Sequence, residues 1–391
     1  MASVVSIKNN QTISELTHNE VESLLAYEKA PSVSIFMPTH PPSLRGTHEN
    51  VVRLKGLLRR AEAELVVRSQ HDPSDHAVLQ PIEQLASAET LLCTGKSLAF
   101  FAGIDFFRAY WLPFELPERV SVGERFLVRP LLPMIAGGDR FYVLALSQKH
   151  IRLLHCTLYG SKEVQLHRVP ANLFEAFENE NFDRQKQFHT ASRFDAGNRP
   201  ISHGSGPEIK DRIVRFFRKV EKGVTDAIHD QKAPLILAGV SYLLPLYREV
   251  NTSPTVLDDA ITGNPDNLSA QQLHAVGWEI VQQRREREKK RARDQYKELA
   301  GAPQASSNLR AIVAAAHNGQ VLSLFLAEGT EQWGFWNAGE GIAHVHYNAE
   351  PGDEDLLNFA AIHTLRHGGN VYSVAPAELP DGANLAALFR F

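Results

Sequence analysis

The chain has very little cysteine and no long apolar run. Its 391 residues include two cysteines, Cys93 and Cys156, which cannot build a disulfide framework and therefore favour a reducing compartment. No apolar stretch approaches the roughly 20 residues that a membrane-spanning helix needs. The chain also lacks a cationic start followed by an apolar run, which is the pattern of a signal peptide. These absences predict a cytoplasmic protein without a membrane partner.

A large excess of charge of one sign is also missing. The formal net charge is −4, and apolar and charged residues make up 43% and 22% of the chain. These values are ordinary for a globular protein and argue against a wholly basic nucleic-acid-binding chain. They leave room for local basic patches, because electrostatic attraction depends on how charges are distributed. The sequence contains no internal repeat and no low-complexity tract.

The order of apolar patterns predicts an α/β (α+β) protein of three domains. A chain of this length is expected to form two to three domains. We expect an N-terminal α/β domain over residues 1–138, a middle domain over 139–267, and a linker helix with a C-terminal domain over 268–391. Periodicity predicts the N-terminal elements. The expected helices are 14–28, 47–68 and 75–92, and the expected strands are 32–38, 97–103, 107–113, 119–123 and 125–132.

The middle domain begins with three apolar runs separated by turn residues. They predict an antiparallel meander over residues 141–148, 150–157 and 162–169. The run at 233–240 is typical of a strand buried on both faces, so we expect a mixed sheet covered by helices. Residues 251–272 are expected to be a turn-rich connector. The last domain should hold helices 268–299, 307–318 and 353–367, and strands 321–327, 333–337, 341–347 and 370–376.

Residues 188–224 are the most informative stretch. Residues 188–206 are rich in polar and turn-forming residues and have no apolar period, which predicts a long loop. A helical period follows over residues 207–229. One side of this helix is apolar and is formed by Ile209, Ile213, Phe216, Val220, Val224 and Ala227. The other side carries the cations Arg212, Arg215, Arg218, Lys219 and Lys222.

The predicted loop ends in His203, Gly204, Ser205 and Gly206, directly before Pro207 in the first helical turn. One interpretation is a flexible loop that caps the helix. The other is a functional tip, because its glycines let the backbone approach another surface closely and His203 would accept a proton. The motif matches neither the phosphate-binding Walker pattern nor the G-x-S-x-G elbow. The sequence leaves both interpretations open.

Two further basic segments have two interpretations each. The cations of helix 47–68 form either a solvated face or a phosphate-contacting surface. Residues 284–293 hold mostly basic side chains and form either a solvated helix between domains or a basic surface. Aromatic residues near the middle-domain cations would stack on RNA bases, although Phe216 suits the core better. These aromatic residues are Phe188, Phe194, Phe216 and Phe217.

We predict no metal site and no cofactor. His363 and His367 lie four apart on an expected helix, but HTLRH lacks the glutamate of the metalloprotease motif. His367 suits the role of a cation at a helix C-terminus. The meander strands carry almost no Asp or Glu, which a two-metal nuclease would need.

The order of the middle-domain features resembles that of the archaeo-eukaryotic class-I release factors and of Pelota, a ribosome-rescue factor. There, two hairpin strands lead into a long loop, a basic helix and a strand ending in Ala-Gly. Here these are FYVLALSQKHIRLL, KEVQLHRVP, the loop ending HGSG, RIVRFFRKVEKGV and PLILAGV. The phrases FMPTH, RFYVLALSQ, LAGVSYLLPLYREVN, PGDEDLLN and HGGNVYSV resemble the bacterial members of this superfamily over nearly the whole chain. The resemblance implies an RNase H-like mixed-sheet middle domain and, from GANLAALFRF, a ribosomal-protein-L30-like C-terminal α/β sandwich.

The resemblance further implies a ribosome- or tRNA-binding factor in translation termination, rescue or quality control. Loop 188–206 would point at the peptidyl-transferase region, and the five cations would contact the phosphates of rRNA, tRNA or peptidyl-tRNA. A protein partner would bind the C-terminal domain. The family's GGQ and NIKS motifs are absent, so neither its glutamine mechanism nor stop-codon recognition is implied. The alternatives are a peptidyl-tRNA ester hydrolase in which His203 positions water, and a non-ribosomal interaction scaffold.

Overall fold

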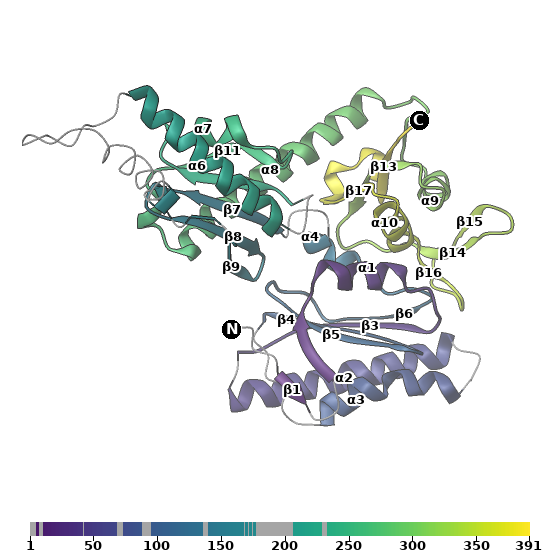
Figure 1. Cartoon of the computed structure of the whole chain (residues 1–391). Helices are drawn as coiled ribbons and strands as arrows, with labels where there is room; N and C mark the ends of the chain where they lie inside the picture. Colours follow the sequence, from purple (N-terminus) through teal and green to yellow (C-terminus); the bar gives the residue numbers. More distant parts are fainter. Residues whose placement is uncertain are drawn as a thin grey trace, which may run out of the picture. The chain divides into compact units, whose positions relative to one another are not determined.

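The protein forms two compact units in a computed structural model (Figure 1). The structure describes residues 5–7, 11–41, 43–68, 73–87, 95–135, 140–176 apart from 168, 171 and 174, 206–228 and 233–391. Unit 1 comprises residues 1–136 and 288–391, and unit 2 comprises residues 137–287. Both units combine helices with mixed sheets, so the predicted α/β class is confirmed. The division into three domains stays a prediction.

The N-terminal part of unit 1 is built on a six-stranded sheet with the order β1-β2-β5-β4-β3-β6. Its helices α2 and α3 lie on one face and α1 on the other (Figure 1). The strands are β1 (Val5–Ile7), β2 (Gln11–Glu15), β3 (Ser32–Pro38), β4 (Ser97–Gly103), β5 (Phe106–Leu112) and β6 (Arg119–Gly123). The helices are α1 (His18–Ala26), α2 (Leu44–Arg68), the 3-10 helix η1 (Pro73–Leu79) and α3 (Gln80–Ser87).

The inner strand β3, between β4 and β6, is buried on both faces, as its continuous apolar sequence predicts. Ile35 belongs to the aliphatic core beneath α2 and α3. The next residue, Phe36, points to the opposite face and packs edge-on against Phe101. Phe126 packs against Phe101 and Tyr27 on this second face. Strand alternation therefore separates a mostly aliphatic core from an aromatic one.

Residues 125–132 were expected to form a strand, and this prediction was wrong. They lead into the 3-10 helix η2 (Arg129–Leu131) and the short helix α4 (Leu132–Ile135). Pro130 has no N–H for a strand ladder and suits the first turn of a helix. The buried Asn358 instead accepts from the Val128 N–H at 2.9 Å and donates to the Phe126 carbonyl at 3.0 Å. The backbone of this segment therefore forms its hydrogen bonds with a side chain that is distant in sequence, which the local sequence pattern cannot predict.

The C-terminal part of unit 1 places α9 (Leu309–His317) and α10 (Leu356–Arg366) against a four-stranded sheet. The sheet order is β12-β18-β13-β17, from β12 (Ala305–Ser306), β18 (Leu385–Phe389), β13 (Val321–Ala327) and β17 (Asn370–Val374). A second sheet joins β15 (Ile342–Val345), β14 (Trp333–Asn337) and β16 (Glu354–Asp355). Two 3-10 helices, η4 (Pro376–Glu378) and η5 (Pro380–Gly382), precede β18. The predicted helices and strands occur here in the expected order, whereas β12, β16 and β18 were not predicted.

Unit 2 is a five-stranded mixed sheet covered by helices on both faces. Its order is β11-β10-β7-β8-β9, and β10 pairs in parallel with both β7 and β11. The strands are β7 (Arg140–Leu146), β8 (Ile151–Thr157), β9 (Gly160–Val164), β10 (Leu235–Gly239) and β11 (Val256–Thr262). The helices are α6 (Gly206–Ala227), α7 (Leu243–Val250), η3 (Pro265–Asn267) and α8 (Ala270–Glu298), whose last residues belong to unit 1. The antiparallel meander β7-β8-β9 and the buried strand β10 confirm two predictions.

The expected turn-rich connector 251–272 contains a strand, so this prediction was wrong in part. β11 pairs with β10 along the edge of the sheet. Its Asp258 and Asp259 are exposed, and the alternation of burial is irregular. Strand propensity is low for aspartate, so the parallel partner β10 rather than local composition makes this segment a strand. None of the described helices combines the length and apolar character needed to cross a membrane.

Candidate nucleic-acid interface

Helix α6 supplies one buried face and one cationic face. Ile213, Phe216, Val220 and Val224 are almost fully buried at spacings of three and four, as the apolar period predicts. They share a core with Leu144 and other residues of the sheet and with residues of α7. Ile209 was expected on the same stripe but is 42% exposed, so the stripe is buried only from Ile213 onward.

The chain segment after β9 crosses α6 closely near the C-terminal end of this helix. A Cβ atom at Gly223 would lie 2.1 Å from Val169 Cγ2 and 3.4 Å from the His167 carbonyl oxygen. No side chain fits in that space without displacing the segment that follows β9. Glycine in a helix interior usually costs about 1 kcal/mol relative to alanine. Here it permits the close contact with Val169.

The opposite face of α6 carries the five predicted cations, and all five are exposed. Arg215, Arg218 and Lys222 follow the i, i+3, i+7 row of a helix surface. Arg212 and Lys219 flank this row, and the Lys219 ammonium also donates to the Ala176 carbonyl at 3.3 Å. At 1.5 Å per residue, the set spans about 15 Å along the axis. We call these five residues the cationic face.

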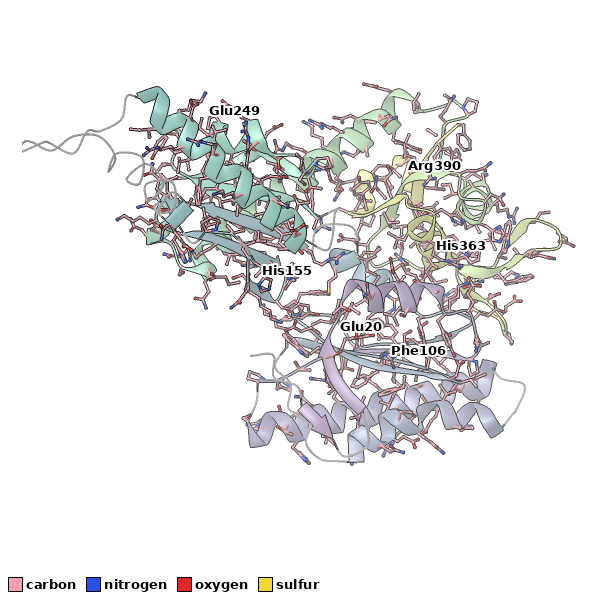
Figure 2. All side chains as sticks on the ribbon, in the orientation of Figure 1. Glu20, Phe106, His155, Glu249, His363 and Arg390 are labelled. Atoms are coloured by element: carbon pink, nitrogen blue, oxygen red, sulfur yellow. The ribbon has the colours of Figure 1, made fainter. Side chains whose placement is uncertain are left out.

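Glu221 and Lys210 of α6 both contact residues that follow later in the chain. One Glu221 carboxylate oxygen accepts from the Thr225 hydroxyl at 3.1 Å and from the Thr252 backbone N–H at 3.2 Å. Lys210 forms an ion pair with Glu249 of α7 at 3.2 Å. Figure 2 labels Glu249 on this helix. Sequence patterns did not reveal these contacts, because the partners lie 31 and 39 residues away along the chain.

Phe216 lies in the core, as expected, and the stacking role considered for Phe217 is excluded, because both side chains are 1% exposed. The two rings lie 5.7 Å apart, and Phe217 packs edge-on against the buried Tyr247. Phe188 and Phe194 lie outside the described residues. So do His203, Gly204 and Ser205, whereas Gly206 is the first residue of α6.

The second basic segment, residues 284–293, is partly engaged in ion pairs. Arg287 contacts Asp259 of β11 at 2.5 Å, and Arg248 contacts Asp258 at 3.6 Å. Further along α8, Arg293 contacts Glu378 at 2.8 Å and the Lys289 ammonium donates to the Ser373 carbonyl at 3.0 Å. Residues 284–293 therefore do not form a fully solvated helix, because several of their side chains contact other elements. Asp258 and Asp259 of β11, a strand that the sequence did not predict, form ion pairs with Arg248 and Arg287.

Unit 2 has no activated nucleophile among its buried groups that the structure describes. Cys156 is fully buried, and burial raises the pKa of its thiol to about 12. A thiol with this pKa stays protonated and unreactive near neutral pH. Burial, with a smaller contribution from Glu221, also raises the pKa of Tyr247. Across the described ranges, no three His, Cys, Asp or Glu side chains are grouped to hold a metal.

The sheet, its parallel crossovers and the basic helix define unit 2 as a mixed α/β domain that presents a cationic helix. The family described as bacterial archaeo-eukaryotic release factor family 3 matches residues 140–320. The match covers unit 2 and the residues up to 320, so this part of the chain is similar to a family of the archaeo-eukaryotic release factor superfamily. No curated protein matches the chain.

Three solved structures match the chain at low identity and with low TM-scores. The archaeal translation termination factor aRF1 is 13% identical, with 97% of this chain and 99% of that chain covered and a TM-score of 0.23. Pelota of Archaeoglobus fulgidus is 12% identical, with 99% and 98% covered and a TM-score of 0.28. Ribosome-bound archaeal Pelota is 11% identical, with 98% and 96% covered and a TM-score of 0.39.

Proposed function

We propose that the chain is a ribosome- or tRNA-binding factor that acts in translation termination, rescue or quality control. The observation that carries the proposal is the cationic face of α6, which lies opposite an apolar face that is buried from Ile213 onward and within the region that matches a release-factor family. In this proposal, loop 188–206 is directed at the peptidyl-transferase region, and the cationic face binds RNA phosphates.

The physical basis is charge density on a preformed surface. Each lysine or arginine that neutralises an RNA phosphate releases condensed counterions, which gives affinity and a strong salt dependence. Arginine adds planar donors that match phosphate oxygens in pairs. Because the buried stripe fixes α6 on the sheet, little ordering of the backbone is needed when the cationic face binds.

The proposal is tested with the triple variant Arg215→Gln, Arg218→Gln and Lys222→Gln. Binding of the full chain to 70S ribosomes is measured by co-sedimentation over a series of salt concentrations. Each phosphate contact contributes about 0.7 to 0.9 to the log–log slope, so the variant should bind more weakly with a slope shallower by about 2 to 3. An unchanged slope would contradict the role of the cationic face.

A matched variant controls for overall charge. Lys55→Gln, Arg59→Gln and Lys297→Gln remove the same number of exposed cations from α2 and α8. This control should keep the wild-type slope. If the control and the triple variant of α6 lose the same slope, the attraction is a property of net charge and not of α6.

Two other functions stay predictions. The hydrolytic alternative assigns His203 the task of positioning water at a peptidyl-tRNA ester, in place of the glutamine of GGQ. The scaffold alternative assigns the C-terminal domain a protein partner outside the ribosome. Absence of co-sedimentation with ribosomes at low salt would favour the scaffold.

A further inference from the structure

A cavity of about 630 Å³ lies along the exposed side of α2, in the N-terminal part of unit 1. Its volume is comparable to that of pockets for small organic ligands, but it is a depression that is widely open to solvent. The proposed ribosomal function does not use it. The cavity borders the segment FMPTH, at the end of β3, and the basic side of α2.

The floor of the cavity is a strip of α2 without a covering side chain. Val52, Gly56 and Arg60 line it at intervals of four residues and therefore share one face of the helix. A Cβ atom at Gly56 would meet no atom within 4 Å, so packing does not require glycine there. Glycine in a helix interior costs about 1 kcal/mol relative to alanine. Val52 is 55% exposed and leaves an apolar surface beside this bare backbone.

The carboxylates at the cavity are already neutralised. Glu49 pairs with Arg45 at 2.8 Å and with His40 at 3.4 Å. The hydrogen bond from Arg45 lowers the pKa of Glu49. Glu118 pairs with Arg53 at 2.7 Å.

Arg60 is different, because it makes no ion pair with any residue that the structure describes. It lies eight residues after Val52, which corresponds to about 12 Å along the helix axis. The positive charge of Arg60 therefore lies at one end of the apolar strip formed by Val52 and Gly56. This arrangement suits a ligand with an apolar body and one anionic group.

The rim of the cavity is held by a buried polar residue. Asn50 is 1% exposed, accepts from the His40 backbone N–H at 2.9 Å and donates to the His40 carbonyl at 3.3 Å. Arg53 also donates to the Pro38 carbonyl at 3.0 Å. These bonds join the end of β3 to α2, so the cavity is formed before a ligand arrives. Preformed sites avoid the entropic cost of ordering on binding.

We propose that this cavity binds a small flat organic anion, with its ring over Gly56 and Val52 and its phosphate or carboxylate beside Arg60. Glycine lets the ring approach the helix backbone closely, which a larger side chain would prevent. The guanidinium of Arg60 presents paired donors to a phosphate or carboxylate. The site lies in unit 1 and is independent of the cationic face of α6.

The test measures binding of adenosine 5′-monophosphate and 2-naphthoate to the full chain by isothermal titration calorimetry. At least one of these anions should bind, and its uncharged counterpart, adenosine or 2-naphthamide, should bind at least tenfold more weakly. Gly56→Leu fills the floor with a better helix former and should reduce binding at least tenfold without lowering the melting temperature. Arg60→Ala should reduce binding of the anion to the level of the uncharged counterpart.

Arg59→Ala is the matched control, because Arg59 is an exposed cation of the same helix that does not line the cavity. It should bind both probes as the wild type does. The proposal is overturned if neither anion binds the wild-type chain, or if Gly56→Leu and Arg60→Ala bind like the wild type. Equal loss in Arg59→Ala and Arg60→Ala would also overturn it, since general charge would then explain the binding.

Discussion

Glu354 is a buried carboxylate in unit 1 whose ionisation is opposed by its surroundings. It is 7% exposed and pairs with Arg125 at 2.7 Å, and Arg125 lies over the Phe359 ring at 4.9 Å. Burial raises the pKa of Glu354 from about 4.5 to about 7, although Arg125 acts in the opposite direction. Glu124 and Asp355 raise this pKa further by repulsion.

His363 on α10 responds to pH in the opposite sense (Figure 2). It is 7% exposed and its ring lies 4.2 Å from that of Phe359. Burial lowers the pKa of His363 to about 3, and the nearby charges of Arg125, His317, Arg366 and His367 act in the same direction. The stability from neutral His363 is present above about pH 6.5 and is lost as the pH falls towards 3.

We predict a distinctive pH dependence for Glu354→Gln. A carboxyl group with a raised pKa contributes most to stability below its unfolded pKa, and this contribution is lost as the pH rises through about 7. The stability of the wild type relative to Glu354→Gln should therefore fall between about pH 4.5 and 7, by roughly 1 kcal/mol per pH unit. Urea unfolding at several pH values measures this difference.

Asp105→Asn is a control for this experiment, because its carboxylate pairs with Lys29 at an exposed site. Its pKa is lowered, first of all by the hydrogen bond from Lys29, so any pH effect should have the opposite sign. A pH-independent difference between the wild type and Glu354→Gln would mean that Glu354 stays ionised in the folded chain. Arg125 would then dominate over burial.

At the scale of elements, α6 followed its sequence pattern closely. The apolar period predicted a helix over 207–229, and the structure has it at Gly206–Ala227. Its exposed cations follow from the same period, because residues opposite a buried stripe face water. The pattern did not predict the close crossing at Gly223, since Val169 comes from a segment 54 residues earlier.

Gly223→Ala should destabilise the protein, although alanine is the better helix former. The new Cβ would lie 2.1 Å from Val169 Cγ2, and β-branched valine has little freedom to move away. Overpacking of this kind typically costs about 1–3 kcal/mol. The free energy of unfolding in urea measures the effect.

Gly56→Ala on α2 is the matched control, because nothing lies within 4 Å of its added Cβ. This change should stabilise the chain by about 0.5–1 kcal/mol. Adding Val169→Ala to Gly223→Ala should recover part of the loss. If Gly223→Ala and Gly56→Ala stabilise the chain equally, the contact with Val169 does not require glycine at position 223.

At the scale of the whole molecule, residues 125–135 belong to the N-terminal part by their position in the sequence but pack against the C-terminal part. These residues follow the N-terminal sheet in the chain, but Leu132 packs in the core of the C-terminal part. Arg129 pairs with Asp355 at 2.8 Å and donates to the Thr330 and Ala327 carbonyls. The N-terminal and C-terminal parts thus form one compact unit, which explains why unit 1 is discontinuous in sequence.

The hydrolytic alternative makes a prediction about the whole factor. If His203 positions water at a peptidyl-tRNA ester, His203→Ala should abolish peptide release from stalled ribosomes and leave ribosome binding intact. Release is followed with a labelled nascent peptide, and binding is followed by co-sedimentation. Equal release by the wild type and the variant would eliminate this role, whereas loss of binding would assign His203 to recognition. His317→Ala, in unit 1, is a control that should not change release.

The sequence by itself determined the elements whose signal is local. Local patterns predicted the strand β3 from its unbroken apolar run and the helix α6 from its helical period. Neighbouring apolar runs separated by turn residues predicted the meander of β7, β8 and β9. The apolar period of α6 also placed the five cations of the cationic face on the exposed side of this helix. Periodicity suffices there because burial of one face selects the conformation.

Only the tertiary structure decided the features that need a distant partner. β11 is a strand because β10 pairs with it, and residues 126–129 are held by Asn358, more than 200 residues away. The bare floor at Gly56 and the close crossing at Gly223 look alike in sequence, and only their surroundings distinguish an open cavity from a tight contact. Backbone satisfaction, charge pairing and close packing depend on groups that the fold brings together, so no local pattern encodes them.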